Sequence, residues 1–164
     1  MDENRVHAAR GPFAGTKGHL DAPYWQSPPD VVTRMLELAA VGPGDCLIDL
    51  GCGDGRIVIA AARSGARAIG VDLDPERIRD ATAAAAAACV GASFRQEDLF
   101  RVDLSEASVV TLYLLGHVNN LVSHKLRQAL RPGARVVSHS FGISNWEPDA
   151  RLEVGNRAIY LWTV

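Results

Sequence analysis

The sequence contains no long apolar run, only three cysteines and no excess of positive charge. No stretch approaches the roughly 20 apolar residues that span a bilayer, so no membrane anchor is predicted. Cys46, Cys52 and Cys89 are odd in number and lie in segments predicted to be buried or tightly packed, which favours free thiols in a reducing cytoplasm over a disulfide framework. The formal net charge of −2 provides no general positive field that would hold nucleic acid by its phosphates. These absences predict a cytoplasmic protein that binds neither membranes nor nucleic acid.

The remaining composition is that of one ordinary globular domain. The chain has 164 residues, of which 48% are hydrophobic and 22% charged, and this length can bury one substantial core. Residues 1–22 are rich in glycine, histidine and charge without an apolar period, so they are predicted to form a flexible arm or a lid. The folded domain is therefore expected over residues 23–164.

Helical and strand patterns alternate along this domain. Ser27 is a candidate helix cap, with Pro28 in the first helical position and Asp30 three residues on. The apolar run "CLIDL", residues 46–50, is typical of a strand buried on both faces of a parallel sheet. Further strands are predicted at 66–74, 92–98, 107–115 and 135–141, and further helices at 55–64, 74–88 and 118–130. Such alternation predicts an α/β fold with a doubly wound, mainly parallel sheet.

The end of the chain departs from this alternation. The segments "RLEV" and "RAIYLWTV" flank Gly155 and Asn156, a pair typical of a tight antiparallel hairpin. With the preceding strands, this C-terminal antiparallel hairpin completes a seven-stranded sheet. A parallel sheet that ends in an antiparallel hairpin differs from the sheet of the dinucleotide-binding dehydrogenase fold.

A turn with three glycines and two aspartates accompanies the first predicted strand, in "IDLGCGDGR". In an open α/β sheet, the first turn from strand to helix is where the backbone approaches a ligand closely. The dinucleotide motif GxGxxG would place its third glycine at Arg56, so the pattern does not match. Asp49 and Asp54 would also repel a pyrophosphate at the helix N-terminus. Two acids beside a bare turn favour a ligand that carries positive charge.

Two further acidic segments indicate a nucleoside. Asp72 ends the next predicted strand, where a carboxylate can accept hydrogen bonds from both ribose hydroxyls. In "QEDLF", Asp98 can meet the amino edge of an adenine and Leu99 its face. A nucleoside with a cationic, amino-acid-like tail satisfies all three positions, and S-adenosylmethionine has that shape. No metal is predicted.

The segments "LIDLGCGDGR", "IGVDLDP", "QEDLF" and "LRPGARVV" resemble, in order and spacing, those of class I S-adenosylmethionine-dependent methyltransferases. The resemblance implies a Rossmann-like fold and an enzyme that converts S-adenosyl-L-methionine to S-adenosyl-L-homocysteine. It implies that Asp49 and the glycine turn hold the methionine end and that Asp72 holds the ribose. The cofactor-binding residues expected on this basis are Tyr24, Asp49, Gly51, Cys52, Gly53, Asp54, Gly55, Asp72, Leu73, Asp98 and Leu99.

A narrower resemblance concerns the acceptor. The segments "PYWQSPPDVVTRMLELA", "VVTLYLL", "RPGARVVSHSF" and "WEPD" are similar to a small group of protein-lysine methyltransferases that act on ATP synthase subunit c and the adenine nucleotide carrier. The first segment of that group is usually closer to PYVPTP, so Trp25 and Gln26 depart from it. This resemblance implies N-methylation of a protein lysine. A small-molecule N- or O-methyltransferase is the alternative, and a cofactor-binding module without catalysis is a third hypothesis.

Residues that touch the acceptor are expected at the ends of the later strands. Tyr113 and His139 are the candidate catalytic residues, although either can instead be a packing residue. His117 and Asn119 are further candidates, or else they begin or cap the following helix. A lysine amine must lose its proton before it attacks, which costs about 4.6 kcal/mol at pH 7 from a reference pKa near 10.4. Such an enzyme therefore needs a base or a desolvated site. Both a monomer and a homodimer are compatible with the sequence.

Overall fold

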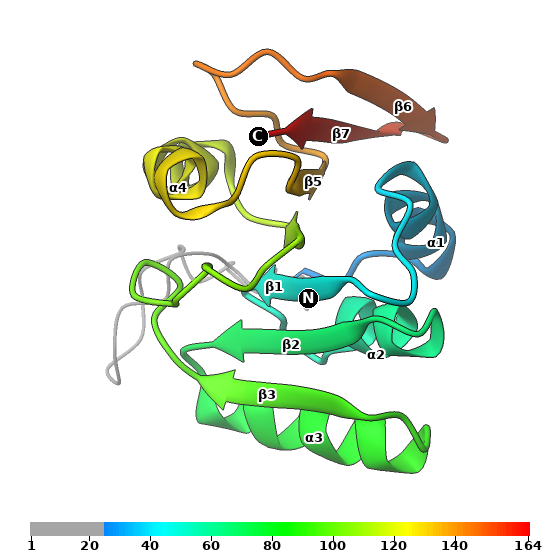
Figure 1. Ribbon diagram of the computed structural model, residues 1–164. Helices are drawn as coiled ribbons and strands as arrows, with labels where there is room; N and C mark the ends of the chain where they lie inside the picture. The colour runs from blue at the N-terminus through cyan, green and yellow to red at the C-terminus, as the bar shows by residue number, and fades with distance from the viewer. Residues whose placement is uncertain (1–24) are drawn as a thin grey trace, which may run out of the picture.

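The computed structural model describes residues 25–164, so the predicted arm and Tyr24 lie outside the described residues. Residues 25–164 form four helices and seven strands in the predicted alternation (Figure 1). The helices are α1 (Pro29–Leu38), α2 (Arg56–Arg63), α3 (Pro75–Ala87) and α4 (Gly116–Ala129), and the strands are β1 (Cys46–Leu50), β2 (Arg67–Asp72), β3 (Ala92–Gln96), β4 (Val109–Leu112), β5 (Arg135–His139), β6 (Ala150–Val154) and β7 (Arg157–Thr163). Within this part of the chain, every helix is too short or too polar to cross a membrane.

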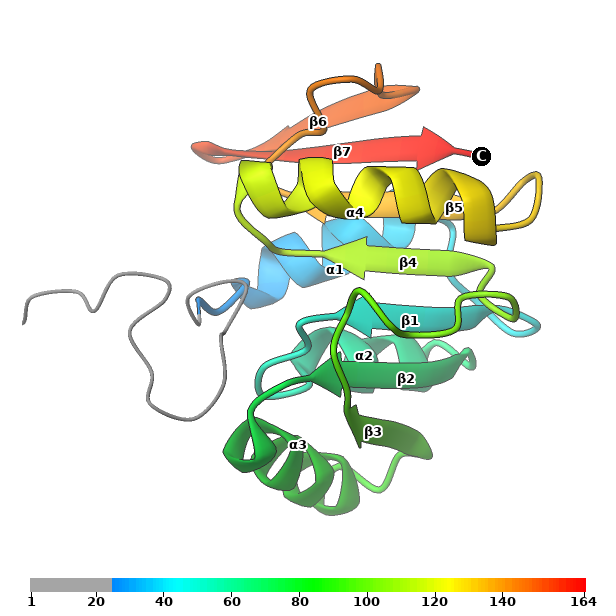
Figure 2. The ribbon, with the colours of Figure 1, turned by 90° about the vertical axis from the view of Figure 1, so that its left-hand side faces the viewer.

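The strands form one sheet in the order β3-β2-β1-β4-β5-β7-β6. The first five are parallel, whereas β7 pairs antiparallel with both β5 and β6, which confirms the predicted fold. Figure 2 shows the arrowheads of β1, β2 and β4 at one edge and that of β7 at the other. The strand order reverses between β1 and β4, and in open α/β sheets such a switch point is where ligands bind.

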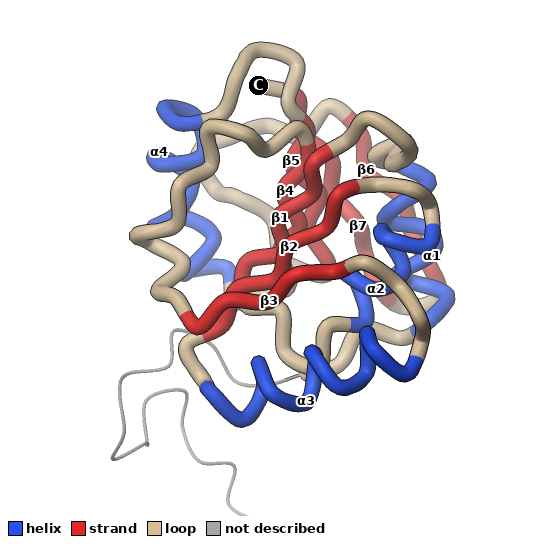
Figure 3. Tube along the Cα trace, turned by 60° about the horizontal axis from the view of Figure 1, so that its bottom comes forward, coloured by secondary structure: helices blue, strands red, loops and turns tan. Residues whose placement is uncertain are grey.

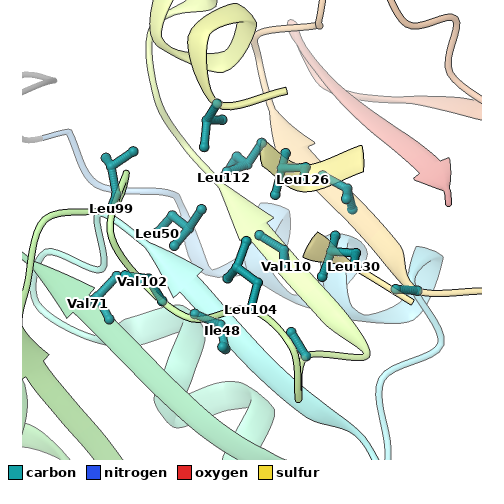
Figure 4. Packing of buried hydrophobic residues seen from close by; sticks show 14 of the residues in the cluster. Ile48, Leu50, Val71, Leu99, Val102, Leu104, Val110, Leu112, Leu126 and Leu130 are labelled. Atoms are coloured by element: carbon teal, nitrogen blue, oxygen red, sulfur yellow. The ribbon is translucent and has the colours of Figure 1, made fainter. Parts of the chain in front are cut away.

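Helices cover both faces of the sheet. Helices α1, α2 and α3 lie on one face and α4 lies on the other (Figures 1 and 3). Leu50 of β1, Leu112 of β4 and Leu126 of α4 are fully buried members of the core beneath α4 (Figure 4). Each such side chain contributes roughly 1.5–3 kcal/mol by its burial. A second core lies beneath α1 and α2 and includes Met35, Leu47 and Val58, so the strands are packed on both faces near the switch point.

One predicted helix cap is confirmed and another is wrong. The Asp74 side chain caps α3 by accepting a hydrogen bond from the Glu76 N–H at 2.9 Å, as predicted. The predicted cap of α1 is wrong, because Pro28 occupies the cap position and no side chain caps this helix. The Ser27 hydroxyl is instead bonded to His139, in a contact that no local sequence pattern encodes.

Strand β4 is shorter than predicted. Its pairing ends at Leu112, so Tyr113 follows the strand and is only partly buried. The chain leaves the sheet at this point because α4 begins only a few residues later, at Gly116. Tyr113 is thereby freed from the sheet and lies at its ligand-binding edge.

Candidate active site

A cavity that is partly open to solvent lies at the carboxyl ends of β1, β2 and β4. Most of the residues predicted to bind a cofactor line it, together with one of the two predicted catalytic residues. The predicted residues in its wall are Asp49, Gly51, Cys52, Gly53, Asp54, Asp72, Leu73, Leu99 and Tyr113. The structure therefore brings together, at the switch point, side chains that lie up to 64 positions apart in the sequence (Asp49 to Tyr113).

The glycine turn folds back over the end of β2. The backbone N–H groups of Gly51 and Cys52 both donate to the Val71 carbonyl, at 2.9 Å each. Gly51 has a φ of +79°, and a Cβ atom there would lie 2.9 Å from the Leu114 side chain. The positive φ therefore favours glycine, and any larger residue would also displace the Leu114 side chain. The turn presents bare backbone to the cavity, as a closely held ligand needs.

Gly55 has a different role from the one expected. It is absent from the cavity wall and is the N-cap residue of α2, with a φ of +80°. A Cβ atom at this position would lie 2.7 Å from the Phe94 ring and 2.9 Å from the Ala81 Cβ. Gly55 thus allows α2 to pack closely against α3 and β3. Its predicted cofactor contact is not supported by this position.

Asp49 places a buried carboxyl at the centre of the site. Its side chain accepts a hydrogen bond from the Thr111 hydroxyl at 2.6 Å, and the residue is only 2% exposed. Burial raises the pKa of Asp49 to about 7, and the neighbouring charges of Asp72 and Asp54 act in the same direction. A cation beside this carboxyl would stabilise its ionised form. The position fits the ammonium group of the methionine tail.

Asp54 is paired within the protein. Its Oδ2 lies 2.6 Å from Arg56 Nη2 and its Oδ1 lies 3.0 Å from Arg56 Nε. Arg56 Nη1 also donates to the Ser27 carbonyl at 2.9 Å, and Gln26 Nε2 lies 3.4 Å from Asp54 Oδ2. The sequence predicts that the negative charge of Asp54 faces the ligand. In the structure this charge is paired with Arg56. The pair ties the glycine turn to the segment before α1.

Asp72 is held by the backbone around it. Its Oδ2 accepts from the Gly53 N–H and its Oδ1 from the Asp74 N–H, both at 3.0 Å. A carboxylate has about four acceptor positions, so capacity remains for a ligand in the cavity that Asp72 lines. Leu73 lines the same wall. This arrangement fits a ribose diol.

The loop after β3 separates the two residues predicted to hold an adenine. Leu99 lines the cavity, but Asp98 does not. Asp98 Oδ1 accepts from the Phe100 N–H at 2.9 Å, so this carboxylate stabilises its own loop. Glu97 occupies the cavity wall instead, and its N–H donates to the Asp72 carbonyl at 3.0 Å. Glu97 could not be predicted from the sequence, because a loop has no regular repeat that shows which of two adjacent acidic side chains faces a ligand.

His139 is buried against the segment before α1. It has no exposed surface, its Nδ1 lies 2.9 Å from Ser27 Oγ, and its ring centroid lies 3.9 Å from that of Tyr113. Burial lowers the pKa of His139 to about 4, and the charge of Arg157 acts in the same direction. His139 is therefore neutral near pH 7 and is absent from the cavity wall. This position does not favour the predicted catalytic contact.

The remaining acceptor candidates lie away from the cavity wall. His117 is exposed in the first turn of α4. Asn119 is buried inside the same helix, where its Nδ2 donates to the Phe141 carbonyl at 2.9 Å and to Ser138 Oγ at 3.2 Å. Asn119 therefore joins α4 to the turn after β5 and does not cap a helix.

A seven-stranded Rossmann-like sheet with these acidic and glycine positions around one cavity defines an S-adenosylmethionine-dependent methyltransferase. Comparison with known families agrees, because the profile of the ANTKMT methyltransferase domain matches residues 49–150. The chain belongs to this family. Its methyl donor is S-adenosyl-L-methionine.

Individual relatives support the same assignment. A protein-lysine N-methyltransferase of Saccharolobus islandicus is 45% identical over 150 residues, which cover 87% of this chain and 93% of that protein. The adenine nucleotide translocase lysine N-methyltransferase of Mus musculus is 36% identical over 88% of this chain and 64% of its own length. A crystal structure described as an RNA methyltransferase from Salinibacter ruber, in complex with S-adenosyl-L-homocysteine, is 48% identical. It covers 85% of this chain and 93% of its own, with a TM-score of 0.83.

Proposed function

We propose that this enzyme transfers the methyl group of S-adenosyl-L-methionine to the side-chain nitrogen of lysine in a protein. The relative from Saccharolobus islandicus supports this proposal, because its name states that activity. The match covers 87% of this chain and 93% of that protein. The mouse relative carries the same chemistry in its name. The single observation of this molecule that best supports the proposal is the charge of the cavity wall.

The wall of the cavity is predominantly acidic. It contains five carboxyl groups and two guanidinium groups, namely Asp49, Asp54, Asp72, Asp74 and Glu97 against Arg56 and Arg77. Asp54 forms an ion pair with Arg56, and Asp74 Oδ2 lies 3.8 Å from Arg77 Nε, so Asp49, Asp72 and Glu97 are the carboxyl groups of this wall outside these two pairs. A negative cleft attracts a cationic side chain such as lysine and opposes a phosphate backbone.

RNA methylation is the second candidate function. Its support is the description of the Salinibacter ruber structure, which is 48% identical to this chain. Against it stand the acidic cavity wall and the formal net charge of −2. Proteins that bind RNA commonly neutralise several phosphates with basic side chains, and the charge of this wall does not provide that field.

The chemistry requires a neutral amine and a dry, aligned approach. The bound cofactor supplies a methyl group already activated by its sulfonium. Trp25, Tyr113 and Leu114 give one side of the cavity an apolar character, and desolvation there lowers the pKa of an entering amine. Because the cavity is partly open to solvent, the amine can lose its proton to water at the cavity mouth before it reaches the methyl group. Alignment and exclusion of water from the reacting atoms then supply most of the rate enhancement.

The proposal places the enzyme in the cytoplasm with its thiols reduced, acting as a monomer or a homodimer. Cys46 and Cys52 are free and buried, and Cys89 is free and exposed. An exposed thiol without a partner is suited to a reducing compartment.

Methyl transfer into a fractionated lysate tests this function. Purified enzyme and radiolabelled S-adenosyl-L-methionine are incubated with lysate, which is then separated into protein, RNA and small-molecule fractions. The proposal predicts label in the protein fraction that resists ribonuclease and is lost on proteolysis. Label confined to RNA supports the second candidate, and label confined to small molecules overturns the proposal. Leu121→Ala, which changes an exposed side chain on α4, serves as a control that retains full activity.

A further inference from the structure

Three aromatic rings gather beside the cavity: Trp25 and Tyr113 line it, and Phe141 packs against both of them without lining it. The Trp25 ring centroid lies 6.3 Å from that of Tyr113 and 6.3 Å from that of Phe141, and the Tyr113 and Phe141 centroids are 6.5 Å apart. The planes of Trp25 and Phe141 differ by 19° and those of Tyr113 and Phe141 by 26°. The planes of Trp25 and Tyr113 are tilted by 43°, so the three rings form an angled apolar surface, which we call the aromatic wall.

The order of strands places this wall beyond the cofactor residues. Along the sheet edge, Glu97 and Leu99 follow β3, Asp72 ends β2, and Asp49 with the glycine turn belongs to β1. Tyr113 follows β4 and Phe141 follows β5, the next two strands along the same edge. Adjacent strands are about 4.8 Å apart. The aromatic wall is thus one to two strand spacings past the glycine turn, on the side away from Asp72.

Trp25 is an unusual component of this wall. It is 49% exposed, although large apolar side chains gain most by burial. Ser27, two residues further along the chain, nevertheless anchors this segment, because it bonds to His139 through its hydroxyl and to Arg56 through its carbonyl. A firmly held segment that presents a half-exposed indole at a cavity mouth is typical of a binding surface.

We infer that the aromatic wall binds the side chain of the acceptor lysine and that Trp25 is the residue that determines this specificity. The inference rests on the proposed function and deepens it. The aliphatic stem of lysine packs along the rings, while the ammonium group is attracted to their faces and to the acidic cavity. Ser27 and His139 are positioning residues, since they act by holding Trp25 in place.

Fluorescence tests the aromatic wall without any methyl transfer. The probe is Nα-acetyl-L-lysine methylamide, and its control is the norleucine analogue, which has the aliphatic stem without the amine. Lysine is expected to change tryptophan emission saturably, and norleucine is expected to bind about 3- to 30-fold more weakly. Phe141→Leu retains Trp25 as the reporter and is expected to weaken the lysine response. No response to lysine, or an equal response to norleucine, overturns the inference.

Kinetics then separate the acceptor site from the cofactor site. Trp25→Leu keeps an apolar side chain but removes the aromatic face. It is expected to raise KM for the labelled protein substrate about 3- to 30-fold. Calorimetry is expected to show the Kd for S-adenosyl-L-methionine changed less than about twofold. An unchanged KM, or a loss of cofactor affinity as large as the change in KM, contradicts the inference even if the wild type methylates lysine. Label that never reaches lysine contradicts the proposed function instead.

Discussion

Ser27 and His139 are 112 residues apart in the chain and share a buried hydrogen bond of 2.9 Å. The bond joins the segment before α1 to the end of β5. Together with the bond from Arg56 to the Ser27 carbonyl, it fixes one wall of the cavity. The position of Ser27 thus depends on β5 and on Arg56 of α2, whereas the sequence pattern around it predicts only a helix cap.

Loss of this hydrogen bond is expected to loosen the wall without changing the acid–base chemistry. Ser27→Ala and His139→Asn should each increase the access of acrylamide to Trp25, measured by fluorescence quenching, and raise the acceptor KM. Because the pKa of His139 is held at about 4, its titration falls outside the working range. The dependence of kcat on pH between 6 and 9 should therefore keep its wild-type shape in both variants. A lost or shifted inflection in His139→Asn would assign His139 a catalytic proton transfer.

Cofactor affinity is expected to depend on pH through Asp49. The pKa of this carboxyl is about 7 before a cation binds, so at lower pH a proton must leave when the ammonium group of the cofactor enters. Affinity should rise about tenfold per unit of pH well below 7 and level off above it. Titration calorimetry between pH 5.5 and 7.5 measures this slope and the protons released. Asp49→Asn should bind weakly with a flat profile, and a wild-type profile that is already flat would contradict the assignment.

Asp72 is expected to hold the ribose. Removing its carboxylate in Asp72→Ala takes away acceptors for the ligand and also frees the Gly53 N–H that it anchors. The Kd for S-adenosyl-L-methionine should increase at least about tenfold, as for the loss of a charge-assisted hydrogen bond. Asp72→Asn keeps one acceptor oxygen and should have an intermediate affinity. Wild-type affinity in the alanine variant would exclude this role.

Gly55 is expected to matter for stability more than for binding. In Gly55→Ala the new Cβ meets Phe94 and Ala81 at a residue whose φ is +80°, so both overlap and backbone strain result. The free energy of unfolding should fall by about 2 to 4 kcal/mol, as measured by denaturant titration. Gly91→Ala is the matched control, since a Cβ there meets nothing within 4 Å. Its stability should change by less than about 0.5 kcal/mol. Equal stability of the two variants would contradict the packing role.

The fold could be predicted from the sequence because the residue patterns that indicate each helix and strand are local. Buried apolar runs such as "CLIDL", the cap at Asp74 and the Gly155–Asn156 hairpin each determine their own element. Parallel strands separated by helices then leave few topologies. Asp49, the glycine turn and Asp72 were likewise predictable, because the two aspartates lie at the carboxyl ends of strands, the turn follows one of these strands, and all reach the same sheet edge.

Contacts between distant segments could not be predicted in the same way. Whether Glu97 or Asp98 faces the cavity depends on how one loop turns after β3. The pairing of Asp54 with Arg56 depends on side-chain conformation, and the burial of His139 depends on Ser27 arriving from the start of the domain. These side-chain positions depend on how the whole chain packs, and no regular pattern in the sequence indicates them.

The identity of the methylated atom tests the central claim most directly. Protein labelled by the purified enzyme with radioactive S-adenosyl-L-methionine is hydrolysed to amino acids, and the labelled species are separated by chromatography and identified by mass spectrometry. The account predicts label in Nε-methylated lysine, dependent on the enzyme and strongly reduced by Asp49→Asn. Label in methylated nucleosides, or in another amino acid with none on lysine, would contradict it.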